Sequence, residues 1–120
     1  MRLTWLVCGA LAVNTYLIGA DETNECAVID PGEAGPVLAA LTAQALRCTH
    51  ILLTHGHFDH VGGVAELQRR TGARVVIHEA DAPMIENSSL SLAALAGQTI
   101  EGARADLLLR GGETLEAAGL

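Results

Sequence analysis

The chain has 120 residues, of which 50% are hydrophobic and 18% are charged, a composition typical of one globular domain or part of one. Its formal net charge is −7, and all seven basic residues are arginines that form no basic run. Such a surface repels phosphate backbones and anionic lipids, so we expect neither a nucleic acid nor a membrane as a partner.

The first thirty residues predict three strands that pair locally as a β-meander. Arg2 and the apolar stretch after it also resemble a weak signal peptide, but Thr4 and Gly9 interrupt that stretch, so a strand is the better interpretation. The expected strands, rich in β-branched and other apolar residues, are residues 3–8, 13–19 and 26–30, with a polar turn at 21–25.

After Pro31-Gly32 the pattern changes to helices that alternate with short apolar strands. We expect a helix over 34–47, a strand over 49–53, a helix from Gly62-Gly63 to about Arg70, a strand over 74–77, helical pieces over 78–85 and 90–96, and a strand over 106–109. This order predicts a mixed α/β sheet with helices packed against one face. No apolar run approaches the roughly 20 residues that span a bilayer.

The three cysteines, Cys8, Cys26 and Cys48, are odd in number and include no C-x-x-C pair. This argues against a disulfide framework and against a structural zinc knuckle. We interpret them as buried free thiols of a protein in the reducing cytoplasm.

A cluster of histidines and one carboxylate follows the strand predicted at 49–53. Residues two apart in an extended segment face the same way, so His55 and His57 can bind one metal together. Asp59 and His60 lie where the chain turns into the next helix and can face a second metal. Imidazole nitrogen and carboxylate oxygen are suitable zinc ligands, and Gly56 lets the backbone pass close to the site. The segment therefore predicts a metal centre.

The segment from Thr54 to Gly63 resembles the T-H-x-H-x-D-H-x-G-G motif of the metallo-β-lactamase superfamily. Asn14–Leu17, Val28–Gly32 and Val76–Asp81 resemble the flanking segments of its glyoxalase II-like branch, whose members are hydroxyacylglutathione hydrolases. The resemblance implies the αββα sandwich of that family, of which residues 1–120 would be a partial domain: the first half, without the C-terminal half.

The resemblance also implies roles for individual residues. His55 and His57 would bind a first zinc ion, and Asp59 and His60 a second, with iron or manganese possible in place of zinc. A hydroxide shared by the two ions would attack the carbonyl carbon of a small-molecule thioester such as hydroxyacyl-glutathione, and Asp59 would orient it. Asp30 would be either a residue that orients ligands by hydrogen bonds or an ordinary turn residue. His50 and His78 match no ligand position.

The family supplies further ligands from later motifs, and none of these follows His78. Each metal would then have two protein ligands, fewer than the three of a typical catalytic zinc site, so this chain alone should bind metal weakly. Alternatives stay open: a mono-iron persulfide dioxygenase-like enzyme, a lactone or β-lactam hydrolase, or a non-catalytic, truncated metal-binding module. We expect that the chain is a fragment of an enzyme.

Overall fold

The computed structural model describes residues 1–9, 11–86 and 101–120, which form a mixed α/β fold. In chain order the elements are β1 (Arg2–Cys8), β2 (Val13–Gly19), β3 (Glu25–Ile29), α1 (Ala34–Ala43), β4 (Arg47–Leu52), α2 (Phe58–Val61), α3 (Val64–Thr71), β5 (Arg74–His78), α4 (Ala82–Glu86) and β6 (Leu107–Leu109).

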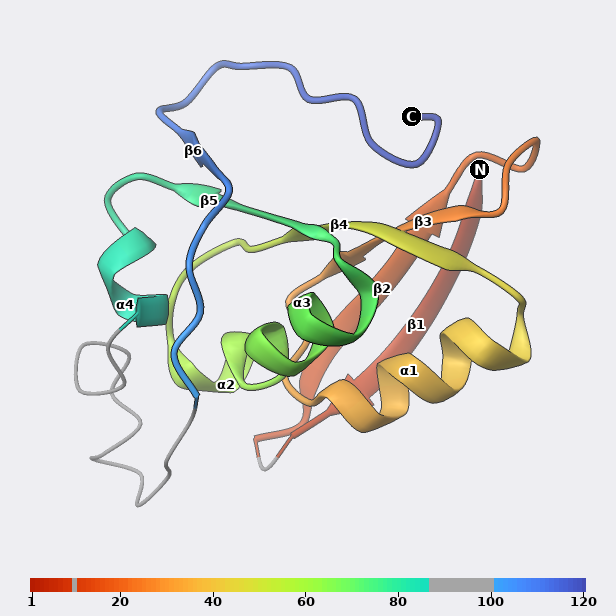
Figure 1. Cartoon of the computed structure of the whole chain (residues 1–120), viewed down its shortest axis with the longest axis horizontal. Helices are drawn as coiled ribbons and strands as arrows, with labels where there is room; N and C mark the ends of the chain where they lie inside the picture. Colours follow the sequence, from red (N-terminus) through yellow and green to blue (C-terminus); the bar gives the residue numbers. More distant parts are fainter. Residues whose placement is uncertain (10, 87–100) are drawn as a thin grey trace.

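The strands form one six-stranded sheet in the order β1-β2-β3-β4-β5-β6. The first two pairs are antiparallel and confirm the expected meander, whereas β3, β4, β5 and β6 run parallel. The helices α1 and α3 cover one face of the sheet, and residues 110–120 pass over the other (Figure 1). There the backbone N–H of Ala20 donates to the carbonyl of Ala118 at 2.9 Å.

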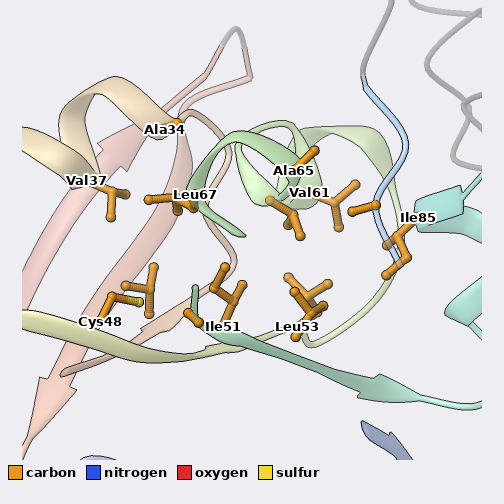
Figure 2. Packing of buried hydrophobic residues seen from close by; sticks show 14 of the residues in the cluster. Ala34, Val37, Cys48, Ile51, Leu53, Val61, Ala65, Leu67 and Ile85 are labelled. Atoms are coloured by element: carbon orange, nitrogen blue, oxygen red, sulfur yellow. The ribbon is translucent and has the colours of Figure 1, made fainter. Parts of the chain in front are cut away.

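The main core lies between the sheet and the helices (Figure 2). Alternate residues of β2 point toward it, so Val13, Thr15 and Leu17 are buried. Ile51 of β4 meets Val37 of α1 and Leu67 of α3, and all three are fully buried. Together these aliphatic side chains hold β4 at the centre of the sheet, and β4 is the strand that leads into the histidine cluster.

Three predicted boundaries in the helical part were wrong. The helix expected over 34–47 ends at Ala43, because Ala45 takes a left-handed backbone with φ of 52° and reverses the chain toward β4. A separate helix, α2, precedes α3, which begins at Val64. His78 closes β5, so the piece expected over 78–85 starts as a helix only at Ala82. The helical piece expected over 90–96 lies outside the described residues.

Gly72 should resist replacement by alanine for a backbone reason alone. It ends α3 with φ of 71°, and a Cβ there would meet nothing within 4 Å, so only backbone strain opposes it. We expect Gly72→Ala to lower the free energy of unfolding by about 1 kcal/mol. Gly35 also has open space around it, but it precedes Pro36 in the first turn of α1, and the proline ring opposes helical backbone at a residue with a Cβ. Because this opposes the gain from a less flexible unfolded chain, Gly35→Ala should change stability by less than about 0.5 kcal/mol. Urea denaturation measures both, and an equal loss in the two variants would contradict the backbone assignment.

Within the described ranges, no helix is both long and apolar enough to cross a membrane.

Candidate metal centre

The histidine cluster lies in the loop that joins the carboxyl end of β4 to α2. Leu53 continues the ladder by donating its backbone N–H to the carbonyl of Val76 at 2.9 Å. The chain bends at Thr54 and reaches His57, the N-cap residue of α2, which has an extended backbone with φ of −67° and ψ of 146°. Asp59 and His60 are therefore in the first turn of α2, while His55 and His57 precede it. Ligand sites of α/β sheets favour this end of a strand.

The three histidine rings of this loop lie against one another. The ring centres of His55 and His57 are 4.7 Å apart, and those of His55 and His60 are 4.0 Å apart. Nε2 of His60 is 3.4 Å from a carboxylate oxygen of Asp59. All four residues predicted as ligands thus belong to one local cluster.

Asp30, at the end of β3, connects this cluster to the neighbouring strand. Its side chain is buried, and its backbone has φ of 50°. Oδ1 accepts the backbone N–H of Thr54 at 2.8 Å, and Oδ2 accepts the hydroxyl of Thr54 at 2.5 Å. Oδ2 also lies 2.9 Å from Nδ1 of His60. The sequence left two interpretations of Asp30 open, a turn residue and a residue that orients a ligand. Both apply, because Asp30 has a left-handed backbone at a turn and its carboxylate contacts the predicted ligand His60.

The contact with Asp30 fixes which nitrogen of His60 can bind a metal. An ionised carboxylate only accepts hydrogen bonds, so Nδ1 of His60 must carry the proton that it shares with Asp30. Nε2 is then the nitrogen left to bind a metal, and it lies 3.4 Å from a carboxylate oxygen of Asp59. Carboxylate–histidine pairs orient ligands in the same way in known zinc sites.

The surroundings of His55 favour its neutral form. Burial lowers the pKa of this imidazole, and the neighbouring rings of His60 and His57 lower it further, against a smaller opposite effect of Asp30 and Asp59. Only a neutral imidazole offers a lone pair to a metal. The cluster therefore favours the protonation state that a metal ligand needs.

The donor atoms do not yet converge as they would around an ion. Among the residues that the structure describes, no three His, Cys, Asp or Glu side chains are arranged to hold one metal. In addition, Nδ1 of His55 accepts the backbone N–H of His57 at 3.2 Å. A zinc–nitrogen bond is roughly 2.0–2.1 Å long, so rings whose centres are 4.7 Å apart can reach one cation by side-chain rotation. The residues fit a metal site in donor type and in sharing one loop, and their side chains would have to rotate to hold an ion.

Gly56 lies between the first two histidines and is buried against α4. A Cβ at this position would be 2.5 Å from Cβ of Met84 and 2.9 Å from the backbone oxygen of Asp81. The carboxylate of Asp81 also accepts the backbone N–H of Gly56 at 3.3 Å. The histidine loop is thus held from the other side by the segment that follows β5.

We expect Gly56→Ala to lower the free energy of unfolding by about 1–3 kcal/mol and to weaken metal binding. The loop must move, because the atoms in the way are a Cβ and a backbone oxygen that cannot swing aside. Thermal unfolding and a zinc titration measure the two effects, with Gly35→Ala as the control for adding a methyl group. A variant as stable as the parent would show that the loop does not pack in this way.

Sequence reasoning missed the supporting roles of Thr54, Asp81 and Met84. The segment Val76–Asp81 was connected with the family motif, but without a role for any side chain. His50 is a half-buried residue of β4, and burial lowers its pKa. His78 is exposed at the end of β5. Neither belongs to the histidine cluster, as expected.

Comparison with known proteins identifies the family. Residues 8–119 match the profile of the metallo-beta-lactamase superfamily, so the chain belongs to that superfamily. A hydroxyacylglutathione hydrolase of Cereibacter sphaeroides is 44% identical over 104 residues, which cover 87% of this chain and 38% of the relative. One of Pseudomonas savastanoi is 41% identical over 125 aligned positions, which cover 87% of this chain and 48% of the relative. The chain thus spans less than half of either relative.

Solved structures of this superfamily confirm the expected fold. BLEG-1 B3 metallo-beta-lactamase has a TM-score of 0.89 at 28% identity, over 98% of this chain and 57% of that chain. TTHA1623, solved in a di-iron-bound form, has a TM-score of 0.78 at 34% identity, over 92% of this chain and 56% of that chain. ETHE1 of Myxococcus xanthus has a TM-score of 0.68 at 27% identity, over 98% of this chain and 44% of that chain.

Proposed function

We propose that this protein is a metal-dependent hydrolase of a small-molecule thioester such as hydroxyacyl-glutathione, with His55, His57, Asp59 and His60 as metal ligands. The observation that carries the proposal is the packing of three imidazoles and a carboxylate on one strand-end loop, with His60 oriented by the buried Asp30. The substrate class is supported by relatives named hydroxyacylglutathione hydrolase at 44% and 41% identity.

Zinc is the metal that we propose, as a pair of ions that would supply a Lewis acid and a nucleophile at neutral pH. His55 and His57 would hold one ion, and Asp59 and His60 the other. Asp30 would keep the proton of His60 on Nδ1, so that Nε2 is the ligand atom. Asp59, at the start of α2, would bind metal and would also orient the attacking group toward the substrate carbonyl. The buried free thiols support a reducing, cytoplasmic setting.

The test is metal removal and replacement in the full-length protein. We expect a chelator to abolish hydrolysis of S-lactoylglutathione and added zinc to restore it. A lactone and a β-lactam, assayed in parallel, should be poor substrates. Hydrolysis that survives complete removal of metal, with metal content measured by mass spectrometry, would refute the proposal. A preference for the lactone or the β-lactam would refute only the choice of a thioester.

Iron is the second candidate, because the similar TTHA1623 was solved with two iron ions. A mono-iron persulfide dioxygenase-like enzyme would keep His55 and His57 as ligands and use Asp59 differently, and the similarity to ETHE1 fits this alternative. Oxygen consumption with a persulfide, dependent on one iron per chain, would favour it over the hydrolase. A non-catalytic metal-binding module would show metal binding but neither activity.

A further inference from the structure

A cavity of 380 Å³ opens at the end of the core opposite the histidine cluster. It lies where the last turns of α1 and α3 meet the first residues of β4. Figure 2 shows Cys48 at one end of the core, with Ile51 and then Leu53 further along toward Ile85. Leu53 is five residue steps beyond Cys48, or roughly 16 Å along an extended chain, so the cavity is well removed from the predicted metal ligands. Its volume falls in the range of small-molecule sites, roughly 300–1,000 Å³.

The inner wall of the cavity is apolar. Leu38, Leu41 and Leu46 line it, together with the thiol of Cys48. Leu41 and Cys48 are buried, and burial raises the pKa of the Cys48 thiol to about 12, so this group stays neutral and behaves as part of the apolar wall. The hollow lies where α1 ends in the small residues Thr42 and Ala43 and where Ala45 turns the chain away.

The mouth of the cavity is positively charged. Two of the seven arginines, Arg47 and Arg70, line it, and both are exposed. Arg47 is paired with Glu25 at 2.5 Å, whereas no described carboxylate pairs with Arg70. No acidic residue lines this cavity, although the chain carries 14 of them. An apolar interior with a cationic mouth suits an amphipathic anion.

We infer that this cavity binds a medium-chain carboxylate, with the hydrocarbon chain against the leucines and the carboxylate at Arg70. The charge of the mouth selects an anion, and the exposed Arg70 offers the forked donors that pair with a carboxylate. The inference concerns α1, α3 and β4 only and is independent of the metal centre.

The experiment is a titration of the isotope-labelled full-length protein with sodium octanoate, followed by NMR. We expect Arg70→Gln to weaken binding by roughly 1.5- to fivefold, the range of one exposed ion pair. Arg69→Gln is the matched control, because Arg69 is the neighbouring residue of α3, pairs with Glu101 and does not line the cavity. It should leave octanoate affinity unchanged. Uncharged 1-octanol should bind more weakly than octanoate.

A second pair of variants tests the position of the ligand. Thr42→Trp places a large ring in the cavity and should abolish binding, whereas Ala43→Trp, one residue further along α1 and outside the lining, should not. Both residues are exposed, so both variants should keep a cooperative melting transition. Equal affinities in the two tryptophan variants would overturn the inference, as would octanoate-induced shifts confined to the exposed Leu3, Trp5 and Val7 of β1.

Discussion

His57→Ala should lower the hydrolytic activity of the full-length protein by more than about a hundredfold and remove metal from it. The reason is that removal of a group that merely orients a ligand already weakens metal sites by about 10- to 100-fold, and loss of the ligand itself should exceed that. His57 is exposed, so its side chain contributes little to the fold. The melting temperature of the metal-free variant should therefore match that of the metal-free parent.

His78→Ala is the matched control for this loss. His78 is also an exposed histidine that follows a buried strand segment, but it lies outside the histidine cluster, where Nε2 is 3.2 Å from the carbonyl of Arg110. We expect its activity and metal content to equal those of the parent protein, with metal measured by mass spectrometry. If His57→Ala retained both activity and metal, the histidine cluster could not be the metal centre.

Asp30→Asn should weaken metal binding by about 10- to 100-fold while the protein still folds. Asparagine accepts the left-handed backbone that Asp30 has, with φ of 50°. It cannot reproduce a charged acceptor for the hydroxyl of Thr54 and Nδ1 of His60, so His60 loses the partner that fixes its proton. We also expect the free energy of unfolding to fall by about 1–3 kcal/mol, because the hydroxyl of Thr54 and Nδ1 of His60 lose their charged acceptor at a buried position.

Asp106→Asn separates the two effects of the Asp30 variant. Asp106 also accepts a backbone N–H, that of Val75 at 2.8 Å, but it does so at the start of β5 and away from the histidine loop. Its replacement should lower stability without any change in zinc affinity, measured by competition with a chromogenic chelator. A zinc affinity that is equal in the Asp30 and Asp106 variants would mean that Asp30 only supports the turn.

Most of the fold could be read from local patterns. The three opening strands were predicted within about a residue of their observed bounds, because β-branched and apolar residues alternate between clear turn signals. The sheet with helices against one face followed from the order of the elements. The separate helix α2 was not predicted, since its four residues are too few to show a helical period.

The histidine cluster could also be predicted from spacing and residue type, but its supports could not. Asp30 and His60 are 30 residues apart, and Gly56 and Asp81 are 25 residues apart. No sequence period connects such pairs. The role of Asp30 therefore stayed open until β3 and β4 were seen side by side. The roles of the four predicted ligands themselves stay predictions until a metal is bound.

The sequence by itself determined the strands, the helical faces and the loop on which three imidazoles and a carboxylate gather, because these depend on residues that are close along the chain. Only the tertiary structure decided where α1 stops. Leu46 packs against the core, and the chain reverses toward β4 at Ala45, which has a left-handed backbone. A left-handed backbone at a helix end is typical of glycine, so an alanine does not predict it. The same reversal opens the cavity beside Leu46, so long-range packing created a site that no motif marks.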